Sequence, residues 1–297
     1  MSNLLCVLGA EKTGTSTLVG MLNCHPKIFI MHEWFVDKKA TRHGSYSYTF
    51  DPNIKKVMRR HSKHSVGILF KGMANQFEKA KYNYTYFGDK WAELGDLNKI
   101  KARISDFESC SEVKTIFAIR DIRTWICHEN IKKMYNNEDN IVPVAIDYLY
   151  YYINSFKLKN NIQVRIEDVI SDYDAVLKKI HLFLQPDIND FIIHANKWWT
   201  KIGIPNFGYN TFPKTTHKWW LHHGSARIKP KQAHIDVKLK SHIFWDAILP
   251  IFDKYYNGKV VLGEVDMDLQ NILDMKDLYK ASMAECYENI VYNNYRV

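Results

Sequence analysis

The sequence lacks several features that mark specialised classes of protein. Its five cysteines are an odd number without a CxxC pair, so neither a disulfide framework nor a zinc ribbon is expected. No stretch approaches the roughly 18 apolar residues of a membrane span. The first nine residues have no basic region and only a short apolar run, which argues against a signal peptide. We therefore expect a protein of a reducing compartment, the cytoplasm.

Glycine and proline are also scarce, with 13 and 8 in 297 residues, and no Pro/Gly/Ser-rich linker divides the chain. This predicts a single domain over residues 1–297, with residues 264–297 as a C-terminal helical extension. The extension has seven acidic and three basic residues. A docked terminal helix is the favoured interpretation, and an oligomer contact or a lid is the alternative.

The charge balance is basic. Lys and Arg number 41 against 32 Asp and Glu, which gives a net charge of +9 and indicates an anionic partner. A non-catalytic protein that binds nucleic acid or an acidic polysaccharide is one such possibility. The basic residues are scattered, however, with only short pairs such as Lys38-Lys39 and Arg59-Arg60. We therefore expect no nucleic-acid partner.

Short apolar runs alternate with helical patterns, which is typical of an α/β protein whose parallel sheet is covered on both faces. The expected strands are 4–8, 28–31, 66–70, 84–87, 115–119 and 162–166. Helices are expected from Thr15 to about Cys24, over 123–135, 144–156 and 244–256, and after the capping residues Asp172 and Asp174.

The loop between the first strand and the first helix carries the strongest chemical signal. It reads G-A-E-K-T-G-T-S-T from Gly9 to Thr17. A loop in this position aims backbone N–H groups and the helix dipole at an anion. Lys12 adds a positive charge, and Thr13, Thr15, Ser16 and Thr17 add hydroxyl donors. The pattern predicts a cradle for phosphate or sulfate.

The same loop departs from the Walker A pattern of ATP-binding proteins. There the lysine follows the second glycine, whereas here Thr15 has that place and Lys12 precedes Gly14. The expected strand 115–119 ends in Arg120 and not in an aspartate suited to hold Mg²⁺. A P-loop kinase acting on a small molecule is therefore the second choice, and a metal-free anionic ligand is the first.

The segment Lys12-Thr13-Gly14-Thr15-Ser16-Thr17-Leu18 resembles the 5′-phosphosulfate loop of sulfotransferases that use 3′-phosphoadenosine 5′-phosphosulfate (PAPS). It fits the family pattern K-[ST]-G-[ST]-[ST]-x-L at every defined place, and His25-Pro26 after the helix is also common there. The resemblance implies a P-loop-like central parallel sheet flanked by helices, PAPS as donor, 3′-phosphoadenosine 5′-phosphate (PAP) as product, and no metal. It makes Lys12 the electrostatic catalyst, and Lys12 to Thr17 the donor-binding loop.

A second segment resembles the family's 3′-phosphate signature, R-[DN]-P-x-x-x-x-x-S. Arg120 and Asp121 fit it, while Ile122 replaces the proline and His128 stands in place of the serine. The resemblance implies Arg120 and His128 as ligands of the 3′-phosphate, with Arg123 as a substitute for His128. Arg227 lies where the family has a late basic loop that closes over the same phosphate.

Three further segments resemble parts of the family in order and spacing. Gly88-Asp89-Lys90 is similar to a G-[ED]-K segment of the carbohydrate-sulfating branch, which implies a catalytic role for Lys90 near the transfer site. Glu33 is placed like the glutamate base of the Golgi-type and bacterial branch, with His32 as the alternative base. Residues 165–168 read R-I-E-D and resemble a segment whose carboxylates are structural.

The function implied is transfer of a sulfuryl group from PAPS, by in-line displacement, to a hydroxyl or an amine of a small-molecule or carbohydrate acceptor. The tryptophan pairs at 198–199 and 219–220 suit stacking on a ligand as well as a core, and no role is assigned to them.

Overall fold

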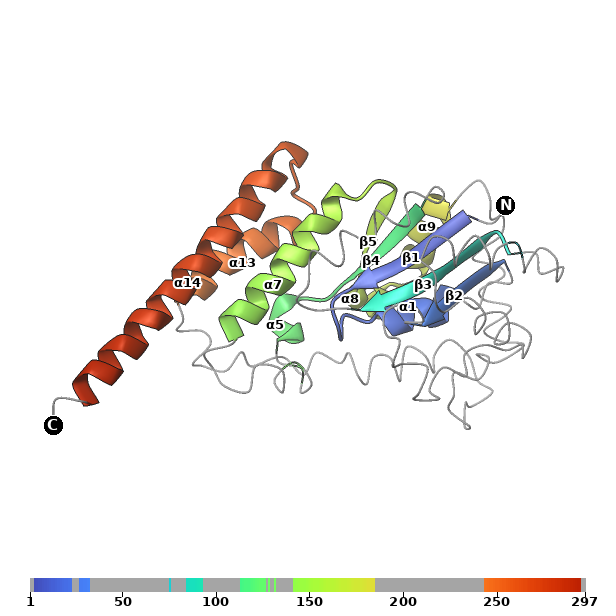
Figure 1. Ribbon diagram of the computed structural model, residues 1–297. Helices are drawn as coiled ribbons and strands as arrows, with labels where there is room; N and C mark the ends of the chain where they lie inside the picture. The colour runs from blue at the N-terminus through green and yellow to red at the C-terminus, as the bar shows by residue number, and fades with distance from the viewer. Residues whose placement is uncertain are drawn as a thin grey trace, which may run out of the picture. The chain divides into compact units, whose positions relative to one another are not determined.

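The computed structural model describes residues 3–22, 27–32, 75, 84–92, 113–126, 128, 131, 141–184 and 243–294 (Figure 1). The chain divides into two compact units. The first consists of residues 1–120 with 158–229, and the second of residues 121–157 with 230–297. The expectation of one domain stays a prediction.

The first unit is built on a five-stranded sheet whose paired strands are all parallel. The strand order is β2-β3-β1-β4-β5, so the first strand of the chain is the central one. Figure 1 shows the five arrows running in a common direction. The strands are β1 (Asn3–Gly9), β2 (Ile28–His32), β3 (Tyr86–Ala92), β4 (Val113–Ile119) and β5 (Asn161–Arg165). The predicted α/β class with a parallel sheet is confirmed.

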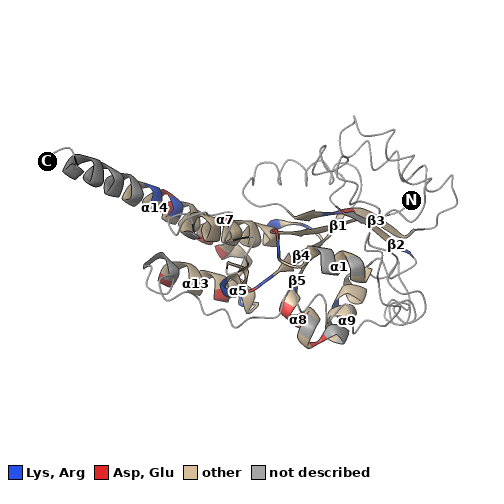
Figure 2. Ribbon diagram, turned by 90° about the horizontal axis from the view of Figure 1, so that it is seen from below, with Lys and Arg blue, Asp and Glu red and all other residues tan. Residues whose placement is uncertain are grey.

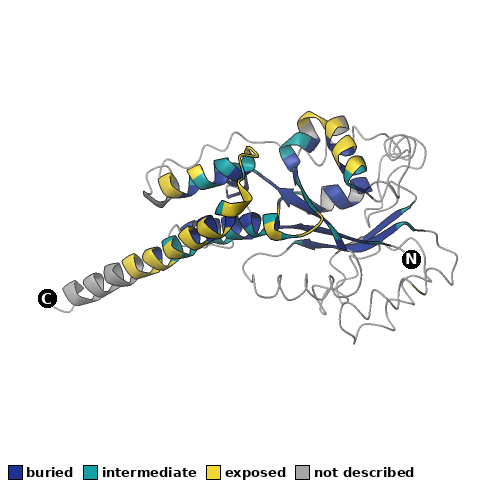
Figure 3. Cartoon of the chain, turned by 90° about the horizontal axis from the view of Figure 1, so that it is seen from above, coloured by how far each residue is buried: buried dark blue, intermediate teal, exposed yellow. Residues whose placement is uncertain are grey.

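The inner strands β1 and β4 of this sheet are almost entirely buried, which explains why they are continuous apolar runs, whereas the edge strand β5 is only half-buried (Figure 3). One face packs in a cluster with α1 (Thr15–Leu22), α8 (Ile166–Ser171) and α9 (Tyr173–Leu184). On the other face Leu4, Cys6 and Leu8 are also buried. Burial raises the pKa of the Cys6 thiol, and the charge of Asp89 raises it further, so Cys6 is a neutral core residue.

Four of the predicted strands agree with the structure to within about two residues, while β3 differs. We expected a strand over 84–87, but β3 runs from Tyr86 to Ala92 and includes Gly88, Asp89 and Lys90. Gly88 belongs in the strand because a Cβ at this position would lie 1.7 Å from the Leu5 carbonyl oxygen of β1. The expected strand 66–70 lies outside the described residues.

Helix α9 is fixed at both ends. At its start the Asp172 carboxylate accepts a hydrogen bond from the Ala175 N–H (3.1 Å), which confirms Asp172 as the cap, whereas Asp174 lies inside the helix. At its end the Tyr86 hydroxyl donates to the Leu184 carbonyl (2.8 Å). The Lys114 ammonium donates to the Phe183 carbonyl (3.2 Å) and to the Tyr86 hydroxyl (2.9 Å). A cation at the carboxyl end of a helix is favourable because the carbonyls there have no partner in the helix.

The second unit is helical and has an aromatic core. Its helices are α5 (Ile122–Trp125), α7 (Ile141–Asn154), α13 (Ile243–Tyr256) and α14 (Val265–Asn294), with the short turns η3 (Ser155–Lys157) and η4 (Leu262–Glu264). Trp125 stacks on Tyr148 with ring centroids 4.2 Å apart, and Phe252 packs against Tyr148 and Tyr152. The predicted helices 144–156 and 244–256 are confirmed as α7 and α13. The helix expected over 123–135 is described only as the short α5 and as Ile131.

Helix α14 contains most of the expected C-terminal extension. One stripe of it, from Val265 through Leu269 and Ile272 to Tyr279, is buried, and Lys276 pairs with Asp147 of α7. These contacts are consistent with a docked helix, and the role of the extension stays a prediction. No helix among the described residues is both long enough and apolar enough to cross a membrane.

Candidate anion-binding site

The topology of the sheet points to its carboxyl edge between β1 and β4. From β1 the chain passes to β2 and β3 on one side, and then returns to β4 and β5 on the other side of β1. In open parallel sheets, ligands bind outside the carboxyl ends of the strands where the strand order reverses in this way. The loop that contains Lys12 follows β1, and Arg120 follows β4, so both predicted segments start at this point.

The turn after β1 has an unusual backbone. Lys12 has φ of 66° and Gly14 has φ of 90°, both in the left-handed region. The Thr13 hydroxyl donates to the Ala10 carbonyl (2.7 Å), and the Thr13 N–H donates to the same oxygen (3.3 Å). Thr13 is fully buried, so both of its donors serve to close the turn. Lys12, at the tip, is exposed.

Helix α1 starts directly after this turn. Its first main-chain hydrogen bond from residue i to residue i−4 runs from the Leu18 N–H to the Gly14 carbonyl (3.1 Å). The N–H groups of the first turn of a helix have no partner within the helix, and they attract an anion. The first turn of α1 contains no acidic residue that would repel one.

Two glycines allow the turn to pack closely. A Cβ on Gly14 would lie 2.4 Å from the Ile166 side chain, at a φ that other residues rarely adopt. A Cβ on Gly9 would lie 2.6 Å from the Thr13 hydroxyl and 2.8 Å from the Ala118 carbonyl oxygen. The turn is thus packed between β4 and the start of α8. Glycine is required at both positions for steric reasons.

Arg120 reaches this turn from the neighbouring strand. It follows the last residue of β4, is only 5% exposed, and donates from Nη1 to the Lys12 carbonyl (3.3 Å). The two residues are separated by 108 positions in the sequence. The structure therefore brings together the starting residues of the two motifs that sequence analysis had treated separately.

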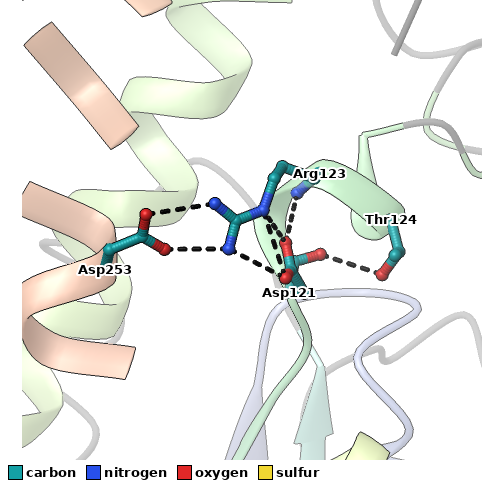
Figure 4. Close-up of polar contacts among 4 residues, drawn as sticks. All are labelled: Asp121, Arg123, Thr124 and Asp253. Atoms are coloured by element: carbon teal, nitrogen blue, oxygen red, sulfur yellow. Dashed lines mark hydrogen bonds and ion pairs between the residues drawn. The ribbon is translucent and has the colours of Figure 1, made fainter. Parts of the chain in front are cut away.

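Arg123 has a different situation, shown in Figure 4. Its guanidinium holds Asp253 of α13 through two hydrogen bonds of 2.8 and 3.1 Å, and its Nε lies 3.0 Å from Asp121. Burial lowers the pKa of Arg123, but the hydrogen bonds and charges of Asp253 and Asp121 raise it by more, so the net shift is upward. A guanidinium held between two carboxylates is poorly suited to bind a phosphate, so we discard Arg123 as the substitute ligand.

His128 belongs to the second unit. It is half-buried, and its backbone N–H donates to the Trp125 carbonyl (3.0 Å) just beyond the end of α5. Its role as a ligand of the 3′-phosphate stays a prediction.

Lys90 lies in β3 near its carboxyl end and is 3% exposed. It is aligned with Val7 of β1 and with His32 of β2. Aligned residues of parallel strands share a face, and Val7 packs in the cluster that includes α1. Lys90 is therefore on the face that α1 covers. Lysine is rarely buried this fully.

Other predicted site residues cannot be placed. Glu33 and Arg227 lie outside the described residues, as do the side chains of His32, Ser16 and Thr17. Their roles stay predictions. Thr15 is placed at the start of α1 and is almost fully buried.

The packing role of Ile166 is a feature that sequence analysis missed. Its segment was recognised, and its acidic residues were expected to be structural. In agreement, Asp168 accepts a hydrogen bond from Arg165 (2.8 Å). The apolar residue between them carries no chemical signal of its own, and only the fold shows that it packs on Gly14.

Basic residues are spread over several elements of the described chain (Figure 2). Several of them pair with carboxylates, namely Arg123, Lys157, Arg165, Lys254 and Lys276. Such pairing reduces the positive field that a nucleic acid would meet. Within the described ranges, His, Cys, Asp and Glu do not gather in a group of three or more that could hold a metal ion.

Comparison with known proteins gives structural similarity only. No protein-family model matches the chain, and no curated protein matches it in sequence. The structure is similar to the sulfotransferase domain of an olefin synthase from Synechococcus PCC 7002, with 13% identity, a TM-score of 0.44, and coverage of 93% of this chain and 96% of the other.

It is also similar to the sulfotransferase domain of the curacin biosynthetic pathway, with 12% identity, a TM-score of 0.45 and coverage of 93% and 98%. A mouse sulfotransferase in complex with PAP is similar at 12% identity and a TM-score of 0.41, with coverage of 85% and 88%. Similarity at this level concerns the fold and does not assign a function. The proposed function therefore depends on the turn after β1.

Proposed function

We propose that this protein is a PAPS-dependent sulfotransferase that transfers a sulfuryl group to a hydroxyl or an amine of its acceptor. The observation that supports the proposal most is the turn after β1. Its tip carries the exposed Lys12, its backbone is left-handed at Lys12 and Gly14, and a helix starts directly after it. A turn of this kind suits a phosphosulfate group, and its sequence fits the donor-binding loop of the family at every defined place.

In this proposal each residue of the loop has a distinct task. Lys12 faces the oxygen that bridges phosphorus and sulfur, where negative charge grows as the sulfur–oxygen bond breaks. The N–H groups at the start of α1, with the hydroxyls of Thr15, Ser16 and Thr17, hold the 5′-phosphate. Thr13 acts by closing the turn, since its hydroxyl already donates to Ala10. Gly14 lets the backbone turn and pack.

The remaining residues bind the 3′-phosphate and assist the transfer. Arg120 and His128, with Arg227, are the proposed ligands of the 3′-phosphate. Lys90 adds a second cation on the face that α1 covers. The acceptor oxygen or nitrogen forms a bond to sulfur, and the bond from sulfur to the bridging oxygen breaks with its electron pair left on PAP. The acceptor proton passes to Glu33, or alternatively to His32.

No metal ion is needed in this scheme, because Lys12 and backbone N–H groups meet the charge of the leaving group. The acceptor class is open between small molecules and carbohydrates. The resemblance of residues 88–90 to the carbohydrate-sulfating branch makes a carbohydrate the first acceptor to assay.

Nucleotide binding measured by calorimetry tests the proposal. Wild-type protein is expected to bind PAP with a dissociation constant below about 1 mM, and to bind ATP–Mg²⁺ more weakly. Lys12→Met is expected to weaken PAP binding about tenfold, since a charged hydrogen-bond donor is lost. Lys159→Met is the matched control, because Lys159 is also exposed but lies just before the amino end of β5.

The two alternatives give different results in the same measurement. Tighter binding of ATP–Mg²⁺ than of PAP would favour a P-loop kinase. Salt-dependent binding of DNA together with no affinity for PAP would favour a non-catalytic basic protein. Either outcome would refute the sulfotransferase proposal.

A further inference from the structure

The left-handed conformation of Lys12 needs support from outside the turn. An L-residue pays about 1–2 kcal/mol to adopt this conformation. Lys12 is exposed, so its own side chain contributes little packing. The hydrogen bonds of Thr13 to Ala10 close the turn around Lys12, but they involve neither the N–H nor the carbonyl of Lys12.

That support comes from Arg120. Its Nη1 donates to the Lys12 carbonyl (3.3 Å), and the carbonyl is the group whose direction depends on the backbone angles of this residue. The surroundings of Arg120 restrict its movement. It is 5% exposed and directly follows β4, a strand that pairs with β1 on one side and with β5 on the other.

We propose that Arg120 is a positioning residue for Lys12, which fixes the turn after β1 in the conformation that receives the 5′ end of the donor. This inference rests on the proposed function. It goes beyond it, because the family resemblance assigns Arg120 to the 3′-phosphate alone. One guanidinium would then serve both ends of the nucleotide, and loss of Arg120 would weaken ligands that have no 3′-phosphate at all.

Adenosine 5′-monophosphate and PAP separate the two roles, because only PAP has a 3′-phosphate. The test variant is Arg120→Met, which keeps an apolar side chain of similar length in a buried place and removes the donors. Arg120→Lys restores a charged donor. Arg165→Met is the matched control, since Arg165 ends the neighbouring strand β5 but bonds to Asp168. Circular dichroism melts establish that each variant is folded.

The first readout needs no ligand. Hydrogen exchange of the peptide that covers residues 10–15 is expected to be about tenfold faster in Arg120→Met than in wild type, and close to wild type in Arg165→Met. The second readout is calorimetry. Adenosine 5′-monophosphate is expected to bind about fivefold more weakly to Arg120→Met than to wild type, and the affinity for PAP is expected to fall by more. Arg120→Lys is expected to recover part of the affinity for both nucleotides.

Each outcome decides the inference. Unchanged exchange in residues 10–15 overturns it. Faster exchange with unchanged affinity for adenosine 5′-monophosphate also overturns it, because the turn would then be held without serving the 5′ end. If wild type binds neither nucleotide, the proposed function fails and the positioning role for a donor fails with it. In that case the exchange measurement still shows whether Arg120 holds the turn.

Discussion

Arg120 and Arg123 both follow β4, but they form contacts with different parts of the protein. Arg120 donates to the Lys12 carbonyl, 108 residues earlier in the chain. Arg123 is held by Asp121, two residues earlier, and by Asp253. Arg120 therefore supports the turn of the candidate site, whereas Arg123 ties α5 to α13 within the second unit. Both residues lie in one sequence motif, and the motif alone does not separate them.

The largest expected effect concerns the turn itself. Gly14→Ala combines a strained φ with a contact of 2.4 Å to Ile166, and we expect it to lower the free energy of unfolding by about 2–5 kcal/mol and to abolish PAP binding. Gly258→Ala is the matched control. Gly258 also has positive φ, but a Cβ there would have no atom within 4 Å. Urea unfolding measures the difference.

The control variant is expected to lose only about 1 kcal/mol, because it has the backbone strain without the collision. Adding Ile166→Ala to Gly14→Ala relieves the collision and leaves the strain, so stability is expected to recover in part. Equal losses in Gly14→Ala and Gly258→Ala would contradict the role that we give to Ile166.

The next effect concerns the second arginine. Arg123→Met leaves two half-buried carboxylates facing each other, and we expect a loss of about 1–3 kcal/mol in the free energy of unfolding. PAP affinity is expected to stay within about twofold of wild type, in contrast to Arg120→Met. Arg123→Met combined with Asp253→Met should regain part of the stability, since an unpaired charge is removed. A loss of PAP affinity in Arg123→Met as large as in Arg120→Met would return Arg123 to the candidate ligands.

The smallest expected effect is on the pH dependence of stability in the second unit. Tyr255 is buried and donates to Asp268 (2.8 Å), and burial, together with this hydrogen bond and the charge of Asp268, raises its pKa. The folded protein therefore holds the phenol proton more tightly than the unfolded chain does. This contribution to stability is complete below about pH 10 and is lost progressively above it.

Tyr255→Phe is expected to cost about 1 kcal/mol at pH 8 and to lose less stability than wild type between pH 10 and 11. Unfolding in urea across this range measures both effects. Lys254 also donates to Asp268, and its pKa is raised as well. Its deprotonation at high pH therefore also lowers stability, but it does so in both wild type and Tyr255→Phe. An equal decline in the two proteins would show that Tyr255 does not titrate as proposed.

Much of the first unit could be predicted because buried parallel strands leave a direct signal. The apolar runs that became β1, β2 and β4 stand out between polar segments, and in β5 only Ile162 and Val164 carry the signal. Asp172 was recognisable as a cap because capping is local. β3 was misplaced because the residue that fixes it, Gly88, is required by the backbone of β1 and not by its own neighbours.

In the candidate site, too, features set by neighbouring residues were predictable, and contacts between distant segments were not. The loop of Lys12 to Thr17 was predictable, since anion binding at the start of a helix depends on a short stretch of chain. The support of Lys12 by Arg120 and the packing of Ile166 on Gly14 join segments far apart in sequence, and no spacing rule predicts them. The pairing of Arg123 with Asp121 was within reach of sequence reasoning, because an acidic helix cap lies two residues before the arginine.

The contact between Gly14 and Ile166 also has a consequence for biosynthesis. The ribosome makes the turn after β1 well before Ile166, whose side chain packs on it, because Ile166 follows β5. A nascent chain that stops before Ile166 has the donor-binding motif without the packing that shapes it. Competence to retain a nucleotide should consequently appear late in translation, when the fifth strand has left the exit tunnel and joined the sheet.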